Sequence, residues 1–127
     1  MNIQMLKDIV SGSLNKTLSF PQIVKLLHED GIESYHVDIV MSETRYYHKS
    51  GETFTAKFPH PFDKPAVEFS AEKIREAISK SQAGRITYRQ FMHEITVAGC
   101  VYYIVYLDGR KVDYLGRKGE SHVEPMP

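Results

Sequence analysis

The 127-residue sequence has a single cysteine, no net charge and no long apolar run. One cysteine cannot form a disulfide within the chain, so we expect a reducing, cytoplasmic setting. Sixteen basic residues balance sixteen acidic ones, and the chain therefore lacks the positive field that draws proteins to nucleic acids or anionic membranes. No stretch resembles a signal peptide or reaches the roughly 20 apolar residues of a membrane-spanning helix. We predict no generic nucleic-acid binding and no membrane association.

The sequence also lacks the short motifs that are typical of metal and phosphate sites. It contains no HExxH motif, no paired CxxC and no glycine-rich phosphate loop. We therefore predict no cofactor.

The chain contains an internal repeat. Residues 2–59 overlay on residues 70–127 at a constant offset of 68 positions without a gap, and a proline-rich linker, residues 59–69, joins them. A fixed period of this kind indicates two copies of one structural unit. In the overlay Cys100 aligns with Ile32, which favours a buried apolar residue over a nucleophile. The identical pairs include Gly31/Gly99, Tyr35/Tyr103, Tyr46/Tyr114 and Gly51/Gly119.

Each copy predicts two helices followed by strands. Apolar residues recur at helical spacing near the start of each copy, and a second helix is expected to begin at Ser19 or Thr87, each followed three residues later by a glutamine that completes a capping box. Both second helices should stop at a left-handed glycine, Gly31 or Gly99. Beyond each glycine the apolar period changes to two, which is typical of a strand with one buried face.

The strands are expected to form antiparallel meanders. Asp108-Gly109 predicts a two-residue hairpin turn that places Tyr103 opposite Tyr114 on the buried face. We therefore predict an α+β fold in which two helix-helix-three-stranded units share one core about a pseudo-twofold axis. The chain is then a single domain, residues 1–127, built of two repeats.

Candidate functional residues are those that differ between the copies and are polar in one of them. They are expected on the sheet face that points away from the helices, where a His/carboxylate cluster could serve a hydrolase or hold a divalent metal ion through His36, His122 and Glu124. The alternative is a solvated sheet face without chemistry. The candidate catalytic residues are His36, Asp38, His122 and Glu124.

The same outer face is unusually apolar in the second copy. Tyr102, Ile104 and Tyr106 occupy alternate positions of one strand that should be polar if that face met only water. Something should cover them, either the other copy or a partner that uses the tyrosines as anchors. These three residues are the predicted contact with a protein partner or with a second copy in a homodimer.

Two segments resemble a known family. Residues 31–54 and 98–127, above all the ending from Tyr114 to Glu124, are similar to the YdfO/YbcV-like family, which is encoded in lambdoid prophages of enterobacteria and in other bacteria. The resemblance implies an α+β fold and a phage or prophage origin, and members are sometimes labelled phage envelope proteins. It carries over no catalytic residues, because the family has no established reaction.

Three functions follow as hypotheses. We favour a non-catalytic binding module for a host or phage protein over an enzyme. The alternatives are a small metal-dependent hydrolase that uses the His/carboxylate cluster and a virion or assembly component. The first requires the apolar outer face to be free, and the second requires the four polar candidates to converge.

Overall fold

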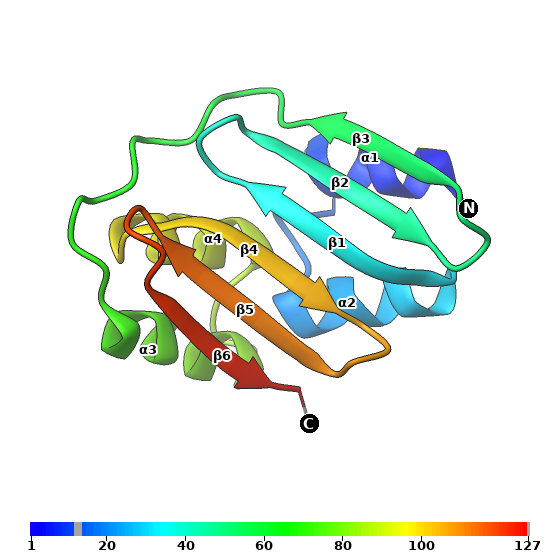
Figure 1. Cartoon of the computed structure of the whole chain (residues 1–127). Helices are drawn as coiled ribbons and strands as arrows, with labels where there is room; N and C mark the ends of the chain where they lie inside the picture. Colours follow the sequence, from blue (N-terminus) through cyan, green and yellow to red (C-terminus); the bar gives the residue numbers. More distant parts are fainter. Residues whose placement is uncertain (12–13, 127) are drawn as a thin grey trace.

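The computed structural model describes residues 1–11 and 14–126, so positions 12, 13 and 127 of the predicted repeats lie outside the described residues. Each copy folds into two helices followed by three strands, which confirms the predicted α+β class (Figure 1). The first copy forms α1 (Ile3–Ser11), α2 (Phe20–Glu29), β1 (Ile32–Asp38), β2 (Glu43–His48) and β3 (Thr53–Lys57). The second copy forms α3 (Ala71–Gln82), α4 (Tyr88–Val97), β4 (Cys100–Tyr106), β5 (Lys111–Gly116) and β6 (Ser121–Pro125).

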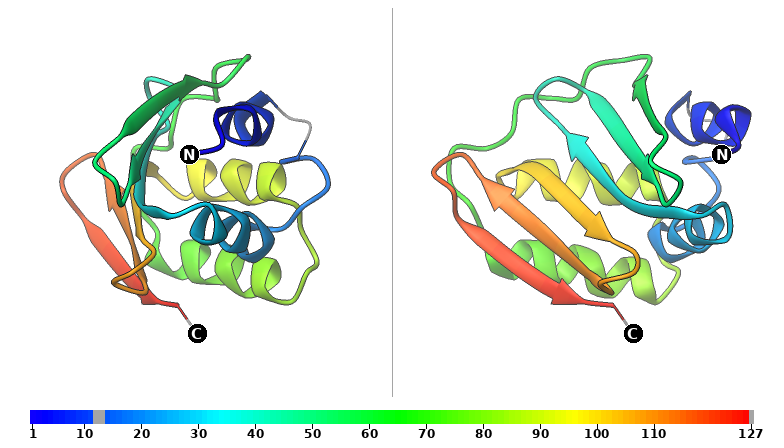
Figure 2. Two further views of the ribbon diagram at one scale, coloured as in Figure 1. Left: turned by 90° about the vertical axis from the view of Figure 1, so that its right-hand side faces the viewer. Right: turned by 45° about the vertical axis from the view of Figure 1, so that its right-hand side comes forward.

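All six strands belong to one antiparallel sheet in the order β3-β2-β1-β4-β5-β6. The helices lie together on one face of this sheet, and the edge-on view in Figure 2 shows the opposite face without a helix. We call that opposite surface the outer face. The helices and the sheet therefore form two layers, and apolar residues of both copies are buried in the core between them.

The copies meet where β1 pairs with β4. His36 lies opposite Ile104, which is its own counterpart at the offset of 68 positions, and the pairs on either side are related by exchange of the copies. Two equivalent hydrogen bonds of 2.9 Å flank this pair, from Ile39 N–H to the Val101 carbonyl and from Leu107 N–H to the Glu33 carbonyl. The pseudo-twofold axis consequently passes between His36 and Ile104.

Local sequence signals at the helix ends act as predicted. The side chains of Ser19 and Thr87 each accept a hydrogen bond from the backbone amide of the glutamine three residues on. The side chain of that glutamine accepts one from the backbone N–H of the serine or threonine, so both capping boxes form. Gly31 and Gly99 follow α2 and α4 with φ of 88° and 90°. These left-handed conformations end the helices and turn the chain into β1 and β4.

The first hairpin of each copy has the predicted register but a different turn. Tyr103 lies opposite Tyr114 and Tyr35 opposite Tyr46, yet the last paired residues are Tyr106 and Lys111. The predicted two-residue turn at Asp108-Gly109 is therefore wrong, because residues 107–110 form a four-residue loop whose left-handed residue is Arg110, with φ of 55°. Residues 39–42 form the same loop, with the left-handed conformation at Ser42.

Tyrosines fill the core beneath the central strands. The two cross-strand pairs have ring centroids 5.8 Å and 5.6 Å apart, and the hydroxyl groups of Tyr88 and Tyr103 share a hydrogen bond. Burial raises the pKa of Tyr88 to about 12. Cys100 is also fully buried, and its pKa is raised to about 12 by the same cause, which supports its interpretation as a core residue.

Candidate functional site

The predicted His/carboxylate cluster is divided between the two faces of the sheet. His36 pairs with Arg45 and Ile104 on the outer face. His122 pairs instead with Tyr114, and Glu124 with Val112, and both partners are buried under the helices. Because paired residues point to the same face, His122 and Glu124 lie on the helix side. Their predicted placement on the outer face is wrong, and the four candidates do not form one site.

The repeat itself carried the signal for the correct face. His122 and Glu124 align with Phe54 and Ala56 of the first copy, and such apolar residues in a strand indicate the buried face. In the structure Phe54 packs against the core and Ala56 is only 6% exposed. The polar residues of β6 thus stand at one edge of the sheet, where the first copy has core residues.

The side chains of His122 and Glu124 form a hydrogen bond with each other at this edge. The Nε2 atom of His122 lies 2.9 Å from Oε2 of Glu124, and both side chains are half-buried. The imidazole also stacks on the buried ring of Tyr114, with centroids 6.4 Å apart and an interplanar angle of 24°. Within residues 1–11 and 14–126, no group of three or more His, Cys, Asp and Glu side chains is arranged to hold a metal ion.

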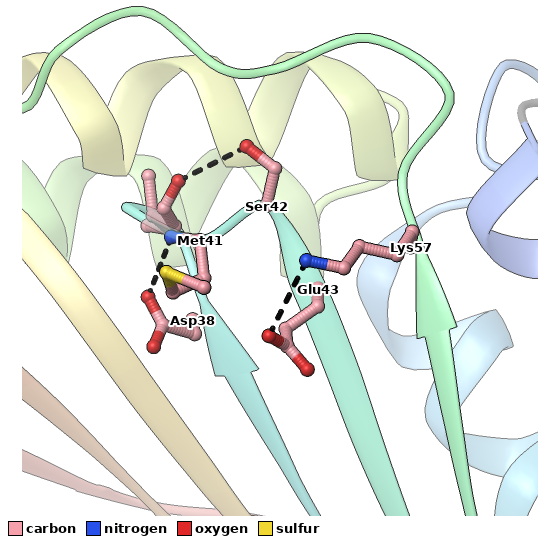
Figure 3. A network of polar contacts seen from close by, with 6 residues as sticks. Asp38, Met41, Ser42, Glu43 and Lys57 are labelled. Atoms are coloured by element: carbon pink, nitrogen blue, oxygen red, sulfur yellow. Dashed lines mark hydrogen bonds and ion pairs between the residues drawn. The ribbon is translucent and has the colours of Figure 1, made fainter.

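Asp38 has a structural partner at the end of β1. Its Oδ1 atom accepts a hydrogen bond of 2.9 Å from the backbone N–H of Met41, while Ser42 Oγ donates to the carbonyl of Ile39 across the same loop (Figure 3). Bonds of this kind stabilise tight turns. Asp38 therefore holds the β1–β2 loop in place.

His36 lies in a partly buried position near the axis. Its ring contacts that of Tyr47 at a centroid distance of 5.0 Å. Partial burial lowers the pKa of His36, and the positive charge of Arg45 on the neighbouring strand lowers it further. Both effects favour the neutral imidazole at neutral pH.

The apolar strip of β4, made of Tyr102, Ile104 and Tyr106, is exposed on the outer face. Tyr102 is 45% exposed and Tyr106 is 37% exposed, and the helices of both copies lie on the other side of the sheet (Figure 2). The second copy extends the same sheet beside the first instead of covering this strip. Lys111 lies over the ring of Tyr106 at 5.6 Å from its centroid, and Val123 on β6 adds further exposed apolar surface.

A cavity of about 370 Å³ lies between α2, α3 and the β5–β6 edge, and of the predicted site residues only Glu124 lines it. Sequence patterns did not reveal it because many of its walls are ordinary core positions of three helices and two strands. The cavity is found only when the segments that cover the sheet in the two copies are compared.

Comparison with protein families identifies the family of this chain. The family model described as "Protein of unknown function (DUF1398)" matches residues 9–124, which is most of the chain. No curated protein matches it. In the part of the chain that the structure describes, no helix has the length and apolar character needed to cross a membrane.

Proposed function

The chain belongs to the DUF1398 family, whose members are proteins of unknown function, and we propose that it is a non-catalytic module that binds a protein partner through its outer face. The observation that carries the proposal is the exposure of Tyr102 and Tyr106 at the centre of a sheet surface that no described helix covers. A strand of a half-solvated antiparallel sheet normally presents polar residues to water. Exposed tyrosines with an aliphatic residue between them are typical of interface anchors.

The composition around the strip supports a protein as the occupant. Charges of both signs surround it, with Arg45 and Lys111 on one hand and Glu43 and Asp113 on the other. An apolar centre with a mixed polar rim is the usual anatomy of a protein–protein interface, whereas a nucleic acid would favour one sign of charge. The similarity to YdfO/YbcV-like proteins supports a host or phage protein of the bacterial cytoplasm as the partner.

The test is capture followed by measurement with purified components. The tagged protein would be used to isolate binders from a bacterial lysate, each binder would be identified and purified, and its affinity would be measured by calorimetry. We expect Tyr102→Ser and Tyr106→Ser each to weaken binding by about tenfold or more, because anchors at an interface centre typically contribute over 1 kcal/mol.

A matched control is available on the helix side. Val97 at the end of α4 is also an exposed apolar residue, 50% exposed, but it lies away from the outer face, so Val97→Ser should leave the affinity unchanged. Equal binding by the tyrosine variants and the native protein would contradict the proposal. Sedimentation equilibrium of the protein alone would show whether the strip instead joins two copies, as an assembly component requires.

A further inference from the structure

The cavity between α2, α3 and β6 is apolar and largely preformed. Its walls come from three helices and the last two strands, and its volume of about 370 Å³ falls within the range of about 300–1,000 Å³ that is usual for small-molecule sites. We call it the α3–β6 cavity. Its apolar lining includes Phe20, Val24, Ile78, Phe91, Tyr114 and Met126.

The pseudo-twofold axis relates this cavity to a much smaller one beside the first copy, which residues of both copies line. The counterpart has a volume of about 40 Å³. Four of its lining residues are the copies of residues that line the α3–β6 cavity, at the offset of 68 positions. The matched pairs are Val10 with Ile78, Arg89 with Pro21, Met92 with Val24, and Phe58 with Met126.

The two cavities differ in size because the linker fills one of them. Pro59, His60 and Phe62 line the small cavity, and the Phe62 ring packs against Phe58 with centroids 4.7 Å apart. The backbone N–H of Phe62 donates a hydrogen bond of 3.1 Å to Ser42 Oγ, which holds the segment in place. An aromatic side chain of the linker therefore occupies this site, and no described segment occupies the α3–β6 cavity in the same way.

Polar groups at the α3–β6 cavity favour an anion. Lys25 lines it, and the counterpart of Lys25 in the second copy is His93. Among the described residues that line it, the one carboxylate is that of Glu124, which is already paired with His122. In addition, Ser81 on α3, which is 2% exposed, lines this cavity, and its hydroxyl has no hydrogen-bond partner among the described residues. A buried hydroxyl without a partner is uncommon in a protein core.

We propose that the α3–β6 cavity binds a small aromatic carboxylate. The aromatic ring occupies the apolar interior, as the Phe62 ring does in the first copy. The carboxylate lies toward Lys25 at the cavity wall. This site is separate from the outer face, so the inference does not depend on the protein-binding function.

The experiment is an NMR titration of the ¹⁵N-labelled protein with 4-phenylbutyrate. A ligand of this size in a suitable cavity should bind with a Kd of about 1 mM. We expect amide shifts to concentrate on α2, α3 and β6, and the uncharged 4-phenylbutan-1-ol to bind more weakly. A Lys25→Glu variant should weaken carboxylate binding by about fivefold, whereas Lys7→Glu on the exposed side of α1 should not change it.

A filling variant tests the position independently of charge. Val24→Trp places a ring inside the cavity and should abolish the shifts while the spectrum stays that of the folded protein. The proposal is overturned if saturating 4-phenylbutyrate moves no amide near the cavity, if the alcohol binds as tightly as the acid, or if only an acidic phenylalanine-containing peptide binds. Should Val24→Trp fail to fold, the exposed Lys25→Glu variant still decides the matter.

Discussion

Replacing Gly99 by alanine should destabilise the protein more than the same change at the other left-handed glycines. A Cβ atom at Gly99 would lie 2.3 Å from the carbonyl oxygen of Glu68 and 2.9 Å from Cα of Phe69. Both contacts are with backbone, and that backbone is fixed by the hydrogen bond of 2.8 Å from Ser70 N–H to the Ala98 carbonyl. The linker therefore cannot move aside without losing its attachment to the end of α4.

Two other glycines separate the cost of the left-handed conformation from the cost of steric contacts. At Gly51, with φ of 95°, a Cβ meets nothing within 4 Å, so Gly51→Ala costs only the left-handed conformation, about 1–2 kcal/mol. At Gly31 the Cβ would lie 2.7 Å from Nε2 of His48, whose bond to the Asp30 carbonyl would be lost at a further cost of about 1 kcal/mol. At Gly99 the backbone clash adds about 1–3 kcal/mol to the conformational term.

Urea unfolding followed by circular dichroism measures the three variants on one scale. We expect the loss in free energy of unfolding to rise from Gly51→Ala through Gly31→Ala to Gly99→Ala, with the last near 3–4 kcal/mol. That value is a large part of the 5–15 kcal/mol typical of a domain. A Gly99→Ala loss no greater than that of Gly51→Ala would refute the steric reasoning, provided that the m-values agree.

The structure supports four further predictions. Because burial raises the pKa of Tyr88 from 10.0 to about 12, its folded state favours the neutral phenol, and stability present below pH 10 should fall as the pH rises toward 12; tyrosinate absorbance followed together with circular dichroism checks this. Cys100 should react with a thiol reagent only after unfolding, since it is buried with a pKa of about 12. In an NMR titration His36 should show a pKa below 6.5, and Arg45→Gln should raise it. Phe62→Ala should enlarge the small cavity of the first copy and lower the free energy of unfolding by about 1–3 kcal/mol, less than for a fully buried ring, as measured in urea.

The sequence was sufficient where structure depends on local signals. The capping boxes at Ser19 and Thr87, and the left-handed conformations at Gly31 and Gly99, follow from hydrogen bonding and steric effects within a few residues. The repeated pattern then fixed the order of elements, because each copy confirmed the interpretation of the other.

Features that depend on loop length or on distant contacts were harder to predict. Asp108-Gly109 favours a two-residue turn locally, but the structure adopts a four-residue loop that keeps the same register, so the error left the strand faces intact. The prediction of which residues of β6 face the helices was wrong. A shift of one residue along a strand moves every side chain to the other face of the sheet, and here it moves His122 and Glu124. The filling of one cavity by Phe62 depends on the path of the linker, which no local pattern encodes.

The position of His36 opposite Ile104 has a consequence for how such a fold can vary. If the two halves were separate identical chains, the residue at this place would face its own copy, and a group that is charged there would meet the same charge across about 5 Å. Covalent linkage of the halves removes that restriction, because each side can mutate alone. A titratable ring can then sit beside an aliphatic one at the very centre of the sheet, which no symmetric pair of identical subunits could achieve.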